Sequence, residues 1–268
     1  ADYLDTETAR IDALIAKKQL LHASLLDRRA AVTYSAVRGD QTATGREFKD
    51  SGIPWLSAAP EHWRAAPLSL VAQLGSGHTP SRERPDWWLD CEIPWITTGE
   101  VTQMRSDRIE YISETRERIS EVGLANSAAE LHPASTVVLS RTASAGFSAI
   151  MGADMATSQD FVTWTCGPLL EPRFLLLCLR AMRTDLLERL AQGSTHKTIY
   201  MPDIKSIRIP LPPLEEQRQI VTRTWDEIRR IDDVVDRLDS QVQLLREHRQ
   251  ALITAAVTGE VDVPPRSA

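Results

Sequence analysis

Two long stretches of the chain repeat apolar residues at every third or fourth position, a spacing that predicts amphipathic helices. The first covers residues 6–38 and stops at Gly39, and the second runs from about Pro213 to Thr258 and stops at Gly259. Glycine just past the last periodic residue is a common helix end, because it adopts a left-handed backbone without strain. The two predicted helices therefore enclose a central segment of different composition.

The second helix follows directly on a predicted strand. Over residues 207–211, isoleucine or leucine alternates with arginine or proline, which is the pattern of a strand with one buried face;. Pro212 and Pro213 remove two backbone donors, which ends a strand, and they suit the first positions of a helix. Glu215 and Glu216 then fall in the first helical turn, where the helix dipole favours carboxylates.

The central segment has the composition of a mixed α/β domain. A polar linker over residues 39–52 precedes it, and six of the seven tryptophans of the chain lie within it, so we expect the main core here. Runs rich in β-branched residues at 93–98 and 136–139 predict short strands. Apolar spacing from Pro172 to about Gln192 predicts an internal helix that ends at a glycine.

The two long helices end in similar sequences, AAVTYSAVRG at 30–39 and QALITAAVTG at 250–259, which are offset by 220 residues. Sliding one helix onto the other by this offset preserves core positions, charges and the terminal glycine, which indicates a duplication. The first helix enters the domain and the second leaves it, so they are antiparallel if they pack together. We expect a two-helix stalk roughly 45 Å long with the domain at one end. The matched pairs are Glu7 with Glu227, Arg10 with Arg230, Ile11 with Ile231, Asp12 with Asp232, Leu25 with Leu245, Arg29 with Arg249, Ala31 with Ala251 and Val37 with Val257.

Charge and composition narrow the function classes. The formal net charge of −6 argues against nucleic-acid binding through bulk charge and leaves a local basic face open;. The longest apolar runs are far shorter than the roughly 20 residues that span a bilayer, and residues 1–20 are charged, unlike a secretion signal. We therefore expect a cytoplasmic protein without a membrane partner. Cys91, Cys166 and Cys178 lack the spacing of a zinc site or a disulfide framework, and we expect buried free thiols.

The sequence carries no signal for catalysis. Adenine methylation would need a Gly-rich cofactor loop and an Asn/Asp-Pro-Pro-aromatic motif, and neither occurs. A phosphate-binding Gly-x-x-x-x-Gly-Lys-Ser/Thr loop is also absent;. The six histidines lack metal-ligand spacing;. We therefore predict no catalytic residue, no metal site and no cofactor for the chain itself.

Several words of the sequence together resemble the specificity subunit of type I restriction-modification systems. They occur in the family's order and cover essentially the whole length. The words are RIDALIAKKQLL at 10–21, SGIPWLSAAPEHW at 51–63, GSGHTPSRERPDWW at 75–88, IPWITTGEV at 93–101, SQDF at 158–161, GSTHKTIYMPDIKSIRI at 193–209, IPLPPLEEQRQI at 209–220 and QALITAAVTGEVDV at 250–263.

The resemblance implies an α/β (α+β) target-recognition domain at 40–211. It would be inserted between two conserved-region helices, at 1–39 and 212–268, that pack as an antiparallel coiled coil. The resemblance also implies a non-catalytic subunit that reads one half of a bipartite site on double-stranded DNA. The helices would set the half-site spacing and dock methyltransferase subunits, which bind S-adenosylmethionine, and a restriction/translocase subunit would complete the complex.

One departure from the family pattern changes the expected assembly. Typical members have two recognition domains, whereas this sequence has one, flanked by both helical repeats. The chain is therefore expected to be either a natural half-subunit or the C-terminal half of a longer subunit. A half-subunit would form a homodimer through the long helices to read a bipartite site, and a half of a longer subunit would read one half-site.

Loops rich in Gly, Ser, Thr and Arg at 75–84 and 141–148, with neighbouring loops, carry the donors that DNA binding needs. Arginine and lysine reach phosphates or guanine edges, and hydroxyls bind bases or backbone. For each residue, an ordinary solvated surface position is the competing interpretation, and Trp87, Trp88 and Trp95 are expected in the core. The candidate DNA-binding residues are Thr79, Ser81, Arg82, Arg84, Thr97, Thr98, Arg105, Arg108, Arg141, Ser144, Thr195 and Lys197.

Two other function classes stay open from the sequence. A structural adaptor would use the coiled coil to dimerise and the central domain to bind protein rather than DNA. A stand-alone nuclease or methyltransferase would show metal-dependent or cofactor-dependent activity from this chain alone. The target sequence and the spacer length cannot be read from the residues, because loop conformation decides which side chain meets which base.

Overall fold

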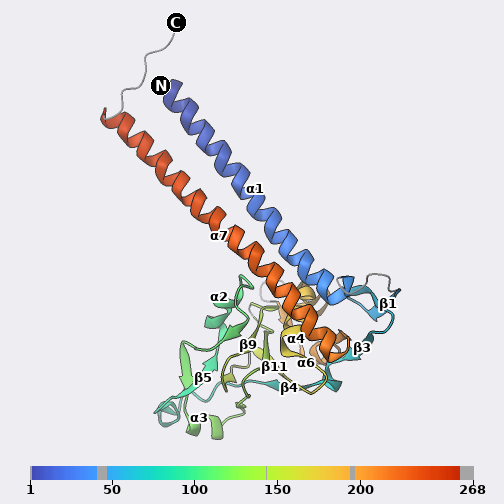
Figure 1. Cartoon of the computed structure of the whole chain (residues 1–268). Coiled ribbons are helices and arrows are strands. Elements are labelled where there is room, and N and C mark those ends of the chain that lie inside the picture. The colour runs from blue at the N-terminus through green and yellow to red at the C-terminus, as the bar shows by residue number, and fades with distance from the viewer. Residues whose placement is uncertain (1, 41–46, 143, 194–196, 260–268) are drawn as a thin grey trace. The chain divides into compact units, whose positions relative to one another are not determined.

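The fold is that of a computed structural model of the chain. The structure describes residues 2–40, 47–142, 144–193 and 197–259. It divides into two compact units, one formed by residues 1–32 with 225–268 and the other by residues 33–224. Most of the two long helices, α1 (Asp2–Arg38) and α7 (Leu214–Thr258), belongs to the first unit, and the strands belong to the second (Figure 1). The predicted fold class, a mixed α/β domain inserted between two long helices, is confirmed.

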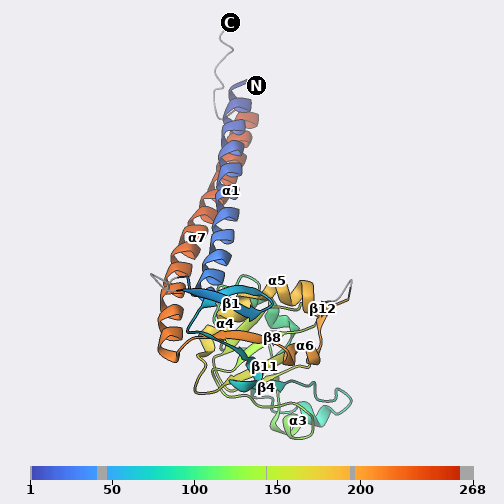
Figure 2. The ribbon, with the colours of Figure 1, turned by 90° about the vertical axis from the view of Figure 1, so that its right-hand side faces the viewer.

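The helices α1 and α7 lie side by side in both views of the ribbon (Figures 1 and 2). Near the start of α1, Asp12 lies 2.8 Å from Arg249 near the end of α7. Further along α1, Arg29 lies 3.0 Å from Asp232, which is closer to the start of α7. Because the order of the partners reverses, the predicted antiparallel packing is confirmed.

Both long helices are amphipathic. Ile11 of α1 and Ile231 of α7 are buried, whereas Leu20 on the other face of α1 is 73% exposed. Arginine and aspartate recur along both helices. In the part of the chain that the structure describes, no helix is long and apolar enough to cross a membrane.

A five-stranded sheet forms the centre of the unit of residues 33–224. Its order is β4-β11-β8-β9-β6, with antiparallel pairing except between β9 and β6, which are parallel. The pairing brings Trp164 opposite both Leu74 and Val137. The strands are β4 (Ala72–Ser76), β6 (Tyr111–Ile112), β8 (Val137–Ser140), β9 (Ser148–Met151) and β11 (Phe161–Cys166).

Smaller elements surround this sheet. β10 (Ala156–Thr157), β5 (Ile93–Ile96) and β7 (Glu117–Ile119) form a second sheet. Two-stranded pairs join β1 (Phe48–Ile53) to β2 (Leu56–Pro60), β3 (Arg64–Pro67) to β14 (Arg208–Leu211), and β12 (Ala191–Gln192) to β13 (Thr198–Ile199). The short helices are α2 (Val101–Met104), α3 (Glu121–Ala125), α4 (Pro172–Ala181), α5 (Arg183–Asp185) and α6 (Met201–Lys205).

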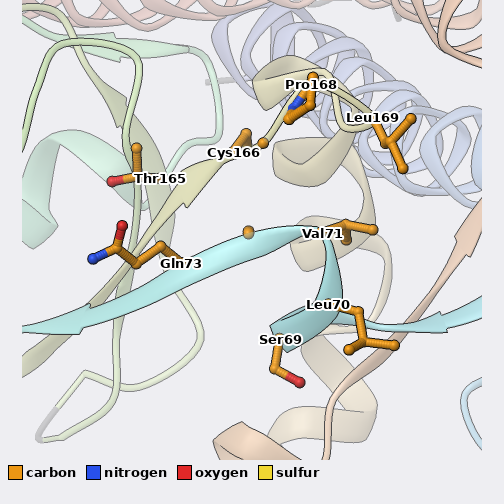
Figure 3. A pocket seen from close by; sticks show the side chains of 10 residues that line it. Ser69, Leu70, Val71, Gln73, Thr165, Cys166, Pro168 and Leu169 are labelled. Atoms are coloured by element: carbon orange, nitrogen blue, oxygen red, sulfur yellow. The ribbon is translucent and has the colours of Figure 1, made fainter.

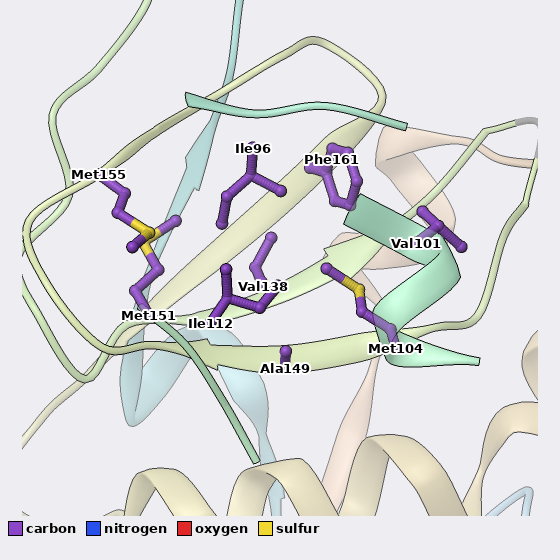
Figure 4. Close-up of a cluster of buried hydrophobic side chains, with 9 residues drawn as sticks. All are labelled: Ile96, Val101, Met104, Ile112, Val138, Ala149, Met151, Met155 and Phe161. Carbon is purple, nitrogen blue, oxygen red and sulfur yellow. The ribbon is translucent and has the colours of Figure 1, made fainter. Parts of the chain in front are cut away.

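The sheet is covered on both faces. Side chains of β8, β9 and β11 pack with Ile96, Val101 and Met104 in one apolar cluster (Figure 4). The alternate residues Val137 and Leu139 are also buried, and α4 packs against β8 and β9. Strands buried on both faces carry continuous rather than alternating apolar residues, as these do.

A buried histidine makes the stability of this core depend on pH. His132 is 5% exposed, and its Nε2 lies 3.4 Å from the Thr163 hydroxyl. Burial lowers the pKa of His132 below its ordinary value of 6.5;. Below that value the unfolded chain binds a proton that the folded chain does not, so this residue lowers stability as the pH falls.

We expect the His132→Gln variant to remove this part of the pH dependence. Between pH 7 and pH 5.5, the free energy of unfolding of the wild-type chain should fall more steeply than that of the variant. The difference in slope is at most about 1.4 kcal/mol per pH unit, the limit for one proton. Urea denaturation at several pH values measures both slopes, and parallel curves would contradict the assignment.

The start of α7 is fixed by a buried amide. Gln217 is fully buried, and its Nε2 donates to the carbonyl oxygens of Leu169 and Pro212, both at 2.9 Å. Its Oε1 accepts the backbone N–H of Glu171, also at 2.9 Å. The side chain therefore joins the first turn of α7 to the end of the preceding strand and to the segment before α4.

The junction itself differs in one respect from the sequence expectation. The strand is present as β14, and α7 begins at Leu214, one residue after Pro213. The alternating pattern predicted that one face of the strand is exposed to solvent. This prediction is wrong, because Pro210 is buried together with Ile209. β14 contacts β1 in addition to its partner β3, so the strand lies inside the domain.

The polar linker predicted over residues 39–52 is only partly correct. Gly39 has a φ of +88° and follows the end of α1, as expected. Residues 48–53, however, form strand β1, which pairs with β2. The strand was hidden because its first three residues are exposed and only Ser51 and Ile53 are buried, so it lacks a regular apolar alternation.

The helix predicted over residues 172–192 is interrupted. α4 stops at Ala181, and α5 and a single π turn over Leu186–Leu190 follow before β12. Met182 has φ −85° and ψ 2°, which departs from helical values;. Next to this break, Arg183 donates to both carboxylate oxygens of Asp107. A contact with a residue 76 positions away leaves no local pattern in the sequence.

Candidate nucleic-acid interface

The loop after β4 is held by backbone contacts to the segment before β11. His78 donates its backbone N–H to the carbonyl oxygen of Thr157 at 3.0 Å. A Cβ on Gly77 would lie 2.1 Å from the same oxygen, so this close approach requires glycine;. Thr79, one of the candidate residues, donates its hydroxyl to Oε1 of Gln159 at 2.6 Å. The loop that carries four candidate residues is thereby anchored at its first end.

Arg141 also contacts the segment before β11. Its Nε donates to the carbonyl oxygen of Gln159 at 3.0 Å, and its backbone N–H donates to that of Asp160 at 2.8 Å. A guanidinium has five N–H donors, and this side-chain bond uses one of them. Thr79 therefore binds the side chain of Gln159, which is exposed, and Arg141 binds its backbone.

The Asp160 side chain holds this segment in place through two hydrogen bonds. Its carboxylate accepts hydrogen bonds from the hydroxyls of Thr142 and Ser158. The next residue, Phe161, is fully buried in the apolar cluster. The SQDF segment thus combines a buried aromatic side chain, a carboxylate that joins it to the loop of Thr142, and an exposed amide.

Arg82 and Arg84 stack on tryptophans. The guanidinium of Arg82 lies 3.8 Å from the ring centroid of Trp88, and its Nη2 donates to Glu117 at 2.9 Å. Arg84 lies 5.0 Å from the ring centroid of Trp87. Stacking and ion pairing restrict these long side chains, which lowers the entropy cost of binding a further group.

Arg84 also has a carboxylate partner. It donates to both oxygens of Asp86, at 3.0 and 2.8 Å. This hydrogen bond raises the pKa of Arg84 and lowers that of Asp86. Ser81 is exposed, and its carbonyl oxygen accepts the indole N–H of Trp88 at 3.1 Å.

The tryptophans are less uniform than predicted. Trp95 is buried, as expected, and packs edge to face with Trp88. Trp87 and Trp88, expected in the core, are half-buried. Arg82 and Arg84 stack on the exposed faces of these two rings. The sequence analysis did not predict this contact.

A separate group forms around α2. Arg105 donates to the hydroxyl of Ser144 at 3.3 Å, which brings two candidate residues together. Its guanidinium lies 5.7 Å from the ring centroid of Phe147. Arg108 is exposed in the following loop.

Two arginines that the sequence analysis missed hold that loop. Arg183 donates to Asp107 at 2.6 and 2.7 Å and to the carbonyl oxygen of Gly146 at 2.9 Å. Arg180 donates to the carbonyl oxygens of Asp107 and Ile109. Asp107 has a positive φ of 55°, a conformation that aspartate tolerates better than most residues;.

The hydrogen-bonding groups of Thr97 stabilise the fold. Its hydroxyl and backbone N–H both donate to the fully buried carboxylate of Glu100, at 3.0 and 2.8 Å, in a capping box. The Thr-x-x-Glu spacing at 97–100 is the sequence signal that could have identified this role. Thr98 is exposed, as a DNA contact requires.

The last two candidates fall near β12 and β13. Lys197 is exposed, and its Nζ donates to the carbonyl oxygen of Leu187 at 2.8 Å. Thr195 lies outside the described residues. The backbone N–H of Ile199 donates to the carbonyl oxygen of Arg141, so the strand after Lys197 is tied to the Arg141 loop.

A groove at the far end of β4 and β11 has a different character. It has a volume of about 650 Å³ and is lined by residues that include Leu70, Cys166 and Leu169 (Figure 3). Burial raises the pKa of Cys166 to about 12, so this thiol is not a nucleophile at neutral pH;. All three cysteines are free, as predicted, although Cys91 and Cys166 are half-buried rather than buried.

Within the described ranges, no group of three or more His, Cys, Asp or Glu side chains converges in a way that could hold a metal ion. The candidate interface therefore consists of arginine, lysine, hydroxyl and amide donors on loops of the unit of residues 33–224.

Comparison with known proteins agrees with this donor set. The family model described as the type I restriction modification DNA specificity domain matches residues 60–241. The chain belongs to this family. The match includes all twelve candidate residues, eleven of which the structure describes, and also the buried Gln217.

Curated specificity subunits match this member of the family over about half their length. The type I restriction enzyme MjaIX specificity subunit of Methanocaldococcus jannaschii is 26% identical over 203 residues, which are 75% of this chain and 44% of the relative. The EcoKI specificity subunit of Escherichia coli K12 is 24% identical over 212 residues, again 75% of this chain and 44% of the relative. This chain therefore spans less than half of these two relatives.

Solved structures share the fold. A chain from a structure titled as the basis of complex assembly and conformational transition of the type I R-M system matches with a TM-score of 0.64. It is 19% identical, and the match covers 95% of this chain and 58% of that one. The HsdS subunit from Thermoanaerobacter tengcongensis matches with a TM-score of 0.54 at 18% identity, over 94% of this chain and 57% of that subunit.

Proposed function

We propose that this specificity-family member is a non-catalytic DNA-recognition subunit of a type I restriction-modification complex. The unit of residues 33–224 reads one half of a bipartite site on double-stranded DNA. Loop donors contact phosphates and base edges, and fixed donors discriminate between bases better than mobile ones. Membership of the family and the donor-rich loops support this function.

One observation carries the proposal furthest, the hydrogen-bonded arrangement of Thr79, Gln159 and Arg141. Thr79 binds the side chain of Gln159 and Arg141 binds its backbone carbonyl oxygen, so residues of three separate loops meet at Gln159. The side chains of all three can form hydrogen bonds with a base edge. The segment below them is fixed by the Asp160 carboxylate and the buried Phe161. Such an arrangement costs little further ordering when DNA binds.

The long helices have a second proposed role, which is to dock methyltransferase subunits and set the spacing between half-sites. Exposed leucines support this role, because apolar side chains on a helix surface suit a partner helix. Leu14, Leu20, Leu21 and Leu26 of α1 and Leu244 of α7 are all more than 40% exposed. The methyltransferase would carry S-adenosylmethionine, and a restriction/translocase subunit would join the same complex.

Selection from random duplexes tests DNA recognition. The purified chain, alone and with a methyltransferase subunit, is incubated with random duplexes at several salt concentrations, and bound DNA is sequenced. We expect one enriched half-site, with affinity that falls as salt rises because phosphate contacts release counterions. Binding without enrichment, or no binding in either condition, would rule out the proposed function and favour a protein-binding adaptor.

We expect Arg141→Ala to reduce affinity for the selected duplex by about tenfold to a hundredfold, or about 1–3 kcal/mol. If Arg141 reads a base, enrichment at one position is lost. If it binds phosphate, affinity falls equally for all sequences, and the salt dependence becomes shallower by about one ion. Arg118→Ala is the control, since Arg118 is an exposed arginine that donates to the backbone carbonyl oxygen of Glu92, beside the acidic groove of Asp90 and Glu121.

Circular dichroism and thermal melting of both variants separate lost contacts from lost folding. Equal affinity of the Arg141→Ala variant and the wild-type chain for the selected duplex would remove Arg141 from the interface.

A further inference from the structure

The backbone around Gln159 is fixed on both sides of the residue. Before it, Ser158 is 3% exposed and donates its backbone N–H to the carbonyl oxygen of Ile96 at 2.9 Å. After it, the carbonyl oxygen of Asp160 accepts the backbone N–H of Arg141 at 2.8 Å, and the carbonyl oxygen of Gln159 itself accepts Nε of Arg141 at 3.0 Å. The fold therefore sets the position of this backbone and leaves the exposed Gln159 side chain to contact another molecule.

A hydrogen bond from Thr79 sets the orientation of the Gln159 amide. The Thr79 hydroxyl donates to Oε1 at 2.6 Å, so the amide oxygen is turned toward the loop after β4. A carboxamide has two lone pairs on its oxygen and two N–H donors on its nitrogen. Among the residues that the structure describes, Nε2 of Gln159 has no hydrogen-bond partner. The amide therefore presents two donors beside one remaining lone pair.

This pattern of donor and acceptor matches one base edge in the major groove of DNA. Adenine presents the acceptor N7 beside the N6 amino group, which is a donor. Guanine presents two acceptors, N7 and O6, so the oxygen of a bidentate glutamine would face one of them. Thymine offers only its O4 acceptor and cytosine only its N4 donor. Adenine is therefore the base that satisfies both ends of the amide together.

The charged groups around Gln159 also suit DNA. The carboxylate of Asp160 accepts hydrogen bonds from the hydroxyls of Thr142 and Ser158, so it is occupied within the fold. The half-buried Arg141 uses one of its five N–H donors on the carbonyl oxygen of Gln159;. Its positive charge next to the amide favours a phosphate backbone at this place.

We propose that Gln159 recognises one adenine of the half-site in the major groove. Nε2 donates to N7 of the base, and Oε1 accepts the N6 amino group. Thr79 is a positioning residue, because its hydroxyl holds the amide in the orientation that adenine requires. The inference rests on the proposed function and deepens it by naming a residue and the base that it recognises.

Selection from random duplexes, as described above, tests the assignment with variants of Gln159. Gln159→Ala removes both hydrogen bonds, and we expect the preference for adenine to fall at least about fivefold at one position while the other positions keep theirs. Gln159→Glu has acceptors only, so the preferred base at that position should change from adenine to cytosine. Gln73→Glu is the matched control, because Gln73 is an exposed glutamine beside the apolar groove at the other end of β4, and it should leave the half-site unchanged.

Variants of Thr79 separate positioning from direct contact. Thr79→Val removes the hydroxyl and keeps the shape of the side chain, so the Gln159 amide can rotate and present its oxygen to N7. We expect the adenine preference to weaken at the same position that Gln159→Ala affects. Thr79→Ser keeps the hydroxyl and should keep the preference. Loss of preference at a different position in Thr79→Val would contradict the positioning role.

A duplex that carries 7-deazaadenine tests the contact at a single atom. This base lacks the N7 acceptor and still pairs with thymine. At the position assigned to Gln159, it should lower the affinity of the wild-type chain at least about fivefold and leave that of Gln159→Ala unchanged. Fluorescence anisotropy with labelled duplexes measures both affinities.

Two results would overturn the inference and leave the proposed function intact. One is an equal loss of affinity for 7-deazaadenine in the wild-type chain and in Gln159→Ala. The other is a selected half-site in which no adenine position responds to Gln159→Ala. If the wild-type chain enriches no half-site at all, the proposed function fails and this inference fails with it.

Discussion

Replacing Gln217 with leucine is expected to lower the free energy of unfolding by about 3–5 kcal/mol, because three buried backbone groups lose their partner at once. The carbonyl oxygens of Leu169 and Pro212 and the N–H of Glu171 all bind this amide at 2.9 Å. Leucine matches glutamine roughly in size but provides neither a donor nor an acceptor. The cost is therefore that of unsatisfied polar groups rather than of a cavity.

The matched control for this prediction is Gln219→Leu, two residues further along the same helix. Gln219 is exposed, so the same chemical change there should alter stability by less than about 0.5 kcal/mol;. Urea denaturation followed by tryptophan fluorescence compares the two variants. Equal stability of the two variants would show that the hydrogen bonds of Gln217 contribute nothing net to folding.

The second large effect is expected from Asp107→Asn. The carboxylate receives two hydrogen bonds from Arg183 at 2.6 and 2.7 Å, and Nε of Arg180 lies 3.4 Å away. The Arg180 side chain is only 4% exposed and that of Arg183 is 21% exposed. Loss of the negative charge leaves two poorly solvated guanidinium groups without their counterion, and we expect a cost of about 2–4 kcal/mol.

Asp90→Asn is the control for the backbone in this experiment. Asp90 shares the left-handed conformation, with a φ of 51° against 55° for Asp107, and it is exposed. Asparagine tolerates this conformation as well as aspartate does, so Asp90→Asn should be nearly neutral. Thermal melting of both variants checks the difference, and similar melting temperatures would mean that the ion pairs contribute little.

Asp107→Asn should also weaken DNA binding if the proposed function is correct. Arg183 bridges the loop of Asp107 to the carbonyl oxygen of Gly146, close to where Arg105 meets Ser144. Loss of this bridge frees two candidate DNA contacts to move, which raises the entropy cost of binding. Gel shifts with the selected half-site, at a temperature where the variant is folded, would measure this loss.

Local patterns explain why the long helices could be predicted. Their apolar spacing, the terminal glycines and the 220-residue repeat are all short-range signals or direct sequence matches;. The capping box of Thr97 and Glu100 is also a local signal, and it shows that one candidate hydroxyl is engaged in the fold.

The rest of the fold depends on residues that are far apart in the chain. Strand β1 is partly exposed and is defined by its pairing with β2, so its own residues lack a clear strand pattern. The break after α4 coincides with the ion pair between Arg183 and Asp107, 76 residues apart. Stacking of Arg82 on Trp88 likewise arises from loop conformation. None of these contacts has a periodic signature.

The candidate interface was only partly specified by residue type. The sequence correctly placed donors on loops, but it could not show that Thr79 and Arg141 both meet Gln159. Nor could it separate Arg105 and Ser144, which bind each other, from the group around Trp87 and Trp88. Which donors act together is a property of the tertiary structure.

Asp12 and Arg29 of α1 are 17 residues apart, and so are their partners Asp232 and Arg249 of α7, so a change in the length of one helix disturbs its pairing with the other. An insertion between Asp12 and Arg29 alone would lengthen one arm by about 1.5 Å per residue and rotate the following residues by roughly 100°. One of the ion pairs would then lose its partner. We therefore expect an insertion or deletion between Asp12 and Arg29 to be accommodated best when the segment between Asp232 and Arg249 changes by the same length.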